Sequence, residues 1–185
     1  MERRTCCRGL LALGMSGLLA ACGALEHASP AIPAIPADLG PRLAGKDQGA
    51  LIGRLLVRGW APDTPAGLTP GLTLRERDPA GAVAVASYFN PGYHRVAYAV
   101  FAGADAAGGE YARAAQALRD NSRGRATTSG ADVTAATLLF YDDTGAGVVQ
   151  VGPVLVRLIA SGSNRAYFDA LVAASITHLQ RALLG

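Results

Sequence analysis

Cysteine is scarce in this chain, and its distribution excludes several kinds of chemistry. The 185 residues contain only Cys6, Cys7 and Cys22, so no thiol follows residue 22. The remaining chain cannot form a disulfide, a zinc site with cysteine ligands or a thiol nucleophile. A domain of this length can bury enough surface to be held together by a hydrophobic core alone.

Common catalytic motifs are absent as well. The sequence has no G-x-S-x-G elbow, no Walker A loop and no S-x-x-K motif. One tryptophan and four phenylalanines offer little for an aromatic carbohydrate platform. The three histidines, His27, His94 and His178, have no spacing typical of a metal site. We therefore expect no metal and no cofactor.

A short apolar run near the N-terminus is too short for a permanent transmembrane helix. Residues 9–21 form an uncharged stretch of thirteen residues, whereas a spanning helix needs about 20. Arg3, Arg4 and Arg8 precede the run, and small residues end it. This order of a basic region, an apolar region and a small-residue cleavage site is typical of a secretory signal peptide.

The end of this leader reads Leu19-Ala20-Ala21-Cys22. The motif resembles the lipobox of bacterial lipoprotein precursors, and the resemblance covers residues 1–22. It implies that Cys22 receives diacylglycerol and becomes the mature N-terminus, because the leader is then removed. Two or more acyl chains give stable membrane anchoring. The resemblance thus implies an extracytoplasmic protein, lipid-anchored to the cell membrane or, since Gly23 is not Asp, to an outer membrane.

Removal of the leader changes the electrostatic interpretation. The full chain has 17 basic and 14 acidic residues, and residues 1–21 contain three arginines and one glutamate. The mature chain therefore has 14 basic and 13 acidic residues, a net charge of +1. A nearly neutral surface gives no electrostatic reason to expect binding to nucleic acid.

The sequence predicts three regions: a signal peptide at residues 1–21, a tether at 22–41 and one domain at 42–185. Pro30, Pro33, Pro36 and Pro41 punctuate the tether and favour an extended polyproline II conformation.

Within the domain, alternating apolar residues predict strands at 82–89 and 95–102, joined by a turn at 90–92. Further strands are expected at 137–141, 148–151 and 154–159, and helices at 106–119 and from Asn164 to the C-terminus. Residues 120–134 are expected to form a loop. The order predicts an α+β fold of two hairpin-plus-helix units, with both main helices packed on one face of an antiparallel sheet.

Asp142 and Asp143 are candidate surface-site residues. The run Asp143-Thr144-Gly145 follows an apolar strand and resembles the aspartic protease signature. That chemistry needs two aspartates sharing a proton, and the motif occurs once. A hairpin turn, which also prefers Asp and Gly, is the favoured interpretation.

His94 is the third candidate. It follows the turn at 90–92, so we expect its side chain at an exposed or half-exposed hairpin tip. His178 is expected at the boundary between the apolar and polar faces of the last helix.

These observations favour a non-enzymatic binding or accessory module of the cell envelope, anchored by Cys22. Its expected partners are the membrane and another envelope protein or a small ligand. Two alternatives remain: a hydrolase of envelope polymers that uses His94, Asp142 or Asp143, and a structural subunit of an envelope complex.

Overall fold

The computed structural model describes residues 30–56, 69–70, 81–89, 94–121, 123–131 and 134–184. They form one antiparallel sheet packed with α-helices, which confirms the predicted α+β fold class. Cys22 and the leader lie outside the described residues, so lipidation stays a prediction.

The sheet has the strand order β1-β2-β3-β7-β6-β5-β4, and every neighbouring pair is antiparallel. The predicted strands are confirmed with small changes of boundary, but β4 lies in the stretch that was expected to be a loop. The strands are β1 (Thr69–Pro70), β2 (Ala82–Phe89), β3 (Arg95–Phe101), β4 (Thr127–Ala131), β5 (Thr134–Tyr141), β6 (Thr144–Val151) and β7 (Val154–Ala160).

Local capping explains where two of the helices begin. Asp47 Oδ1 accepts a hydrogen bond from Ala50 N at 2.8 Å, and Asn164 Oδ1 accepts one from Tyr167 N at 2.8 Å. Each bond satisfies an amide of the first turn that has no partner within the helix. The helices are α1 (Leu39–Ala44), α2 (Gln48–Leu55), α3 (Ala104–Arg119) and α4 (Arg165–Leu184).

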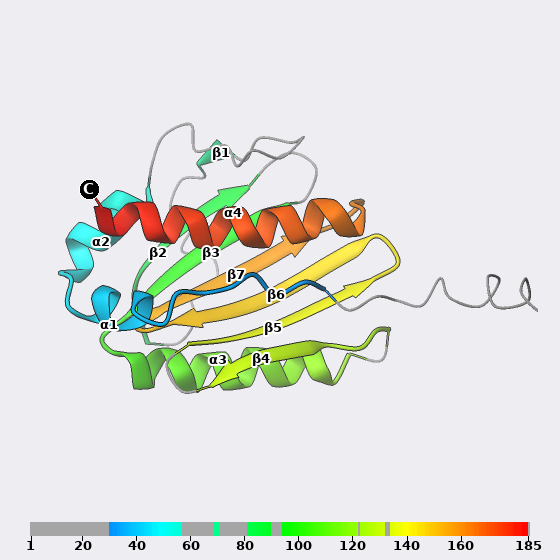
Figure 1. Ribbon diagram of the computed structural model, residues 1–185, viewed down its shortest axis with the longest axis horizontal. Coiled ribbons are helices and arrows are strands. Elements are labelled where there is room, and N and C mark those ends of the chain that lie inside the picture. Colours follow the sequence, from blue (N-terminus) through cyan, green and yellow to red (C-terminus); the bar gives the residue numbers. More distant parts are fainter. Residues whose placement is uncertain are drawn as a thin grey trace, which may run out of the picture.

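The two long helices pack on opposite faces of the sheet, so the prediction that they share one face is wrong. On β3, Tyr98 packs with the residues of α4, whereas Ala97 and Ala99 pack with residues of α3. The physical reason is that β3 is buried on both faces and therefore needs cover on both. The helix α3 connects β3 to the edge strand β4 and crosses the side of the sheet opposite α4 (Figure 1).

The face under α4, here called the α4 face, holds the larger core. It combines α1, α2 and α4 with large side chains from the strands. The fully buried side chains include Tyr88, Tyr98 and Leu138 from the strands and Phe168 from α4. The opposite side, here called the α3 face, has a smaller core built mainly from alanine, with Phe101, Val148 and Leu155.

Part of the predicted tether packs against the domain. Pro30 is buried, and Ile32 and Ile35 pack against the core of the α4 face. Ala31 N donates to Asp169 Oδ1 at 3.1 Å. This segment, residues 30–38, is here called the strap; it runs across the sheet beside α4 (Figure 1). Residues on both sides of position 41 therefore pack against the same core.

Candidate functional site

A hollow of about 300 Å³ lies on the α3 face, between α3 and the strands β3, β7 and β6. Its volume is at the lower end of the range of about 300–1,000 Å³ seen for small-molecule sites. Most of its wall is apolar, and the side chains are unusually small. The lining residues are Arg95, Ala97, Ala99, Ala114, Ala117, Leu118, Ala146, Gly147, Val148, Arg157, Leu158 and Ile159.

The hollow exists because two polar contacts hold α3 above the sheet while small residues face it. Tyr111 and Thr137 share a hydrogen bond of 2.9 Å, which ties the middle of α3 to β5. Arg157 Nη2 donates to Glu110 Oε1 at 2.9 Å, which ties α3 to β7. Beyond these contacts, Ala97 on β3 and Ala114 on α3 line the hollow with short side chains.

Ile159 is the clearest sign that this part of the sheet lacks its usual cover. It lies in the central strand β7, yet its side chain is 46% exposed. The other exposed large hydrophobic residues of the described chain, Leu56 and Leu184, lie at helix ends, where exposure is ordinary. An apolar side chain exposed beside an apolar hollow is typical of a binding surface.

Arginines surround this apolar wall. Glu110, whose side chain is only 10% exposed, forms ion pairs with both Arg157 and Arg113. Arg95 Nη2 donates to Ser87 Oγ at 3.4 Å. Among the described residues, no carboxylate forms an ion pair with Arg95. The hollow therefore combines an apolar wall with one guanidinium whose charge is not neutralised by a described neighbour.

His94 is buried rather than exposed, so the prediction of an exposed or half-exposed position is wrong. Its side chain is 8% exposed. Nε2 lies 3.1 Å from Ser161 O, and Nδ1 lies 2.7 Å from the hydroxyl of Tyr167. Because a carbonyl oxygen only accepts, Nε2 carries a proton and donates it to Ser161 O. His94 thus fastens the start of β3 to the loop before α4.

Asp142 and Asp143 form the turn between β5 and β6, as the hairpin interpretation predicts. Both are exposed, and Asp142 has a φ of 50°, a left-handed conformation that aspartate tolerates in tight turns. Asp143 Oδ1 accepts from Thr144 Oγ1 at 3.1 Å. Their role as site residues stays a prediction.

The fold brings His94 and Asp143 to the same end of the sheet through one loop. Ser161 O accepts from His94, and Ser163 N donates to Asp143 O at 2.9 Å. A shallow, open depression of about 490 Å³ lies there, lined by His94, Gly162, Ser163, Asn164, Ala166, Tyr167 and Ala170. Within the described part of the chain, the side chains of His94 and Asp143 form no hydrogen bond or ion pair with each other.

His178 is buried in the core of the α4 face, whereas the sequence predicts it at the boundary between the apolar and polar faces of the helix. Its side chain is 4% exposed, and Nε2 lies 2.9 Å from Leu55 O and 3.2 Å from the hydroxyl of Tyr88. Burial lowers the pKa of His178 from its ordinary value, so the neutral ring is favoured. Burial also raises the pKa of Tyr98, whose hydroxyl donates to Ser175 O at 3.0 Å. These contacts join α2 and α4 to the sheet.

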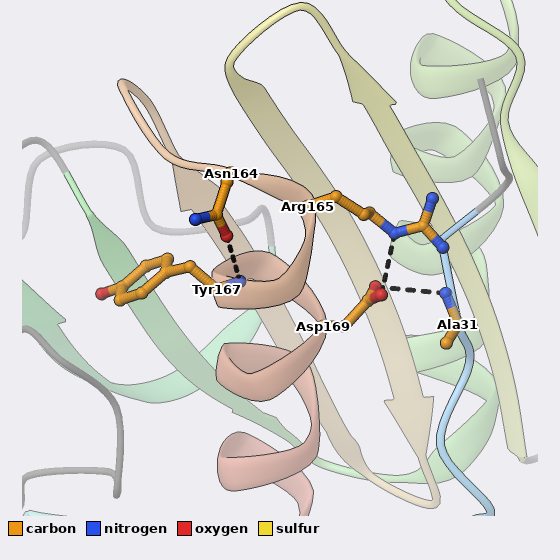
Figure 2. A network of polar contacts seen from close by, with 5 residues as sticks. All are labelled: Ala31, Asn164, Arg165, Tyr167 and Asp169. Carbon is orange, nitrogen blue, oxygen red and sulfur yellow. Dashed lines mark hydrogen bonds and ion pairs between the residues drawn. The ribbon is translucent and has the colours of Figure 1, made fainter. Parts of the chain in front are cut away.

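The first turn of α4 anchors two different segments on opposite sides of the helix. Figure 2 shows Tyr167 on one side, and Asp169 on the other with Arg165 and Ala31. Arg165 Nε donates to Asp169 Oδ2 at 2.8 Å while Ala31 N donates to Oδ1. Asp169 therefore fixes the point at which the strap enters the domain.

Two further features bear on membranes and metals. No helix within the described ranges is long and apolar enough to cross a bilayer. In the same ranges, no three side chains of His, Cys, Asp or Glu gather as metal ligands would.

Comparisons with known proteins assign no family. No protein-family model and no curated protein matches the chain. Among solved structures, the extracellular domain of PknH from Mycobacterium tuberculosis aligns with 82% of this chain and with 100% of its own. The sequence identity is 14% and the TM-score is 0.38.

The hollow was not found by sequence reasoning. Arg95, Arg157 and Ile159 belong to predicted strands, and their positions in the sequence do not indicate that they lie around one hollow. One signal was present: between residues 95 and 101, small alanines alternate with Val96, Tyr98 and Val100. Such alternation indicates two faces of different packing density.

Proposed function

We propose that this chain is a lipid-anchored, extracytoplasmic binding module of the cell envelope, with the hollow on the α3 face as its ligand site. The observation that carries the binding role is the apolar hollow beside the exposed Ile159 and the unneutralised Arg95. The lipobox Leu19-Ala20-Ala21-Cys22 supports the location.

The strap supports a position close to the membrane surface. Seven residues separate Cys22 from Pro30, where the chain is already packed against the domain. A chain of eight residue steps spans at most about 29 Å when fully extended. If Cys22 carries the lipid, the domain is held within that distance of the bilayer, with the entry point set by Asp169.

The alternative of a hydrolase has less support from the described geometry. Asp142 and Asp143 lie exposed on a hairpin turn, and the ring nitrogens of His94 bond to Tyr167 and Ser161. Glycoside hydrolases place two carboxylates on either side of the bond that they cleave, whereas both aspartates here are exposed on one turn.

The Cys22→Ala variant tests the anchor. We expect the wild-type protein to incorporate labelled palmitate and to be found in the membrane fraction. The variant should lose the label, and with it the lipid that retains the protein in the membrane. Cys6→Ala and Cys7→Ala are matched controls within the same leader, and both should retain the label. Label that survives in Cys22→Ala would refute lipid attachment at this residue.

A further inference from the structure

We propose that the hollow on the α3 face binds a fatty acid, with its single alkyl chain between α3 and the sheet and its carboxylate on Arg95. This inference rests on the proposed binding function and names the ligand class. It concerns the side of the sheet opposite α4 (Figure 1), away from the strap.

The shape of the hollow suits one alkyl chain. A volume of about 300 Å³ is small, and the wall consists mainly of alanine with Leu118, Val148 and Ile159. Such a wall offers contacts to methylene groups and few hydrogen bonds, so an apolar ligand gains most by leaving water. A diacyl lipid has two chains and is too large for this space.

The ligand should also cover Ile159. This side chain is 46% exposed in a central strand, which costs hydrophobic free energy that an alkyl chain would recover. A chain running from Ile159 towards Ala99 would contact β7, β3 and α3 together. An apolar ligand would therefore bury the part of the sheet around Ile159 that α3 does not bury.

Arg95 selects the head group. Arg157 and Arg113 already share Glu110, whereas Arg95 bonds to the neutral hydroxyl of Ser87. Arg95 and Ile159 are paired in the register of β3 and β7, so their backbones are neighbours, while the guanidinium of Arg95 reaches Ser87 on β2. A guanidinium binds a carboxylate through two parallel hydrogen bonds.

A carboxylate fits this site better than a phosphate does. A phosphate monoester carries a charge of about −1.5 to −2 at neutral pH, which calls for more than one available cation. The hollow offers one described arginine without a carboxylate partner. The single charge of a fatty acid matches it.

Calorimetric titration with dodecanoate, below its micelle concentration, tests the proposal. The protein is the acyl-free chain from residue 23, which retains every buried residue that the structure describes. We expect saturable one-to-one binding, and we expect dodecanol and dodecyl phosphate to bind at least about tenfold more weakly. Arg95→Ala should weaken dodecanoate binding by roughly 10- to 100-fold, and Arg95→Lys by less.

Filling the hollow tests the position of the chain. Ala97→Leu places bulk on its floor, and Ala117→Trp places bulk on its exposed rim without disturbing the buried core. Both substitutions should abolish dodecanoate binding. Because Ala117 is exposed, Ala117→Trp keeps the test valid even if Ala97→Leu prevents folding. Arg42→Ala removes an arginine from α1, and it should bind dodecanoate as the wild type does.

Several results would overturn the proposal. Absence of binding, equal binding of dodecanol, or binding that survives both Arg95→Ala and Ala117→Trp would each refute it. Tighter binding of dodecyl phosphate would refute the carboxylate assignment. These assays use acyl-free protein, so their failure is distinct from failure of the palmitate-labelling experiment at Cys22.

Discussion

The two faces of the sheet use the same strands but are packed differently. On β3, the residues that point to the α4 face are Val96, Tyr98 and Val100, and all are fully buried. The residues on the other side include Ala97 and Ala99, and there a hollow remains. The comparison teaches that the size of alternate side chains decides whether a sheet face becomes a sealed core or a binding surface.

The cover differs as well. The α4 face is closed by three helices and the strap, whereas α3 is the one described helix on the opposite side. Buried polar residues reinforce the closed face, since Tyr98 bonds to Ser175 O and His178 to Leu55 O. The larger core and the proposed binding site thus lie on opposite sides of one sheet.

The largest expected effect is a truncation on the α4 face. Phe168 is fully buried, and its ring lies 6.0 Å from that of Phe140. Phe168→Ala should reduce the free energy of unfolding by about 3–5 kcal/mol, because it removes buried surface and leaves a cavity. Chemical denaturation of both proteins measures the change.

The matched variant on the α3 face is Leu118→Ala, since Leu118 is half-buried at the hollow. Its cost should be about 1 kcal/mol, because the residue already borders empty space. Equal losses in the two variants would contradict the difference between the faces.

The next effect concerns the strap. Asp169→Ala removes the acceptor for Ala31 N and the partner of Arg165, and it should cost about 1–2 kcal/mol because the site is partly solvated. Hydrogen exchange of the Ala31 amide should become fast. Asp169→Asn retains an oxygen acceptor, so that amide should stay protected. Unchanged protection in Asp169→Ala would show that another contact holds the strap.

The smallest effect is a pH dependence of the closed face. Burial lowers the pKa of His178 in the folded state, whereas an unfolded histidine titrates near about 6.5. As the pH falls below that value, the unfolded chain takes up the proton first, so stability decreases until the folded-state pKa is reached. Among the described residues, Tyr88, Tyr98 and Arg181 are ionisable groups near the ring.

Denaturation at about pH 7.5 and about pH 5 measures this dependence. His178→Gln retains a donor for Leu55 O but does not titrate. Its loss of stability on acidification should therefore be smaller than that of the wild type. An equal loss would assign the pH dependence to other groups.

Local signals predicted much of the fold. The apolar stripe behind the Asn164 cap predicted α4, and alternation with a turn predicted the β2–β3 hairpin. The strand β4 was missed because Thr127–Ala131 is polar, contains Gly130 and pairs on one side only, as an edge strand. Its pairing with β5 is a tertiary effect that propensity does not report.

The site was less accessible to sequence reasoning. His94 is buried by Ser161 and Tyr167, which lie some seventy residues away in the chain. The hollow forms where α3 crosses the sheet from β3 to the edge strand β4. The order of helices and strands in the sequence did not reveal this, because it is also compatible with both helices on one face. The residues that line the hollow are therefore set by this tertiary arrangement together with the small side chains on the α3 face.

Mapping of backbone amide shifts during titration with dodecanoate tests the central claim most directly. The division between the faces predicts saturable shifts at Ala97, Ala117 and Ile159 around the hollow. It predicts no comparable shifts at Leu171 or Val172 in the core of the α4 face. Largest shifts in the α4 core, or no saturable shifts at the hollow, would contradict the claim that the α3 face is the binding side.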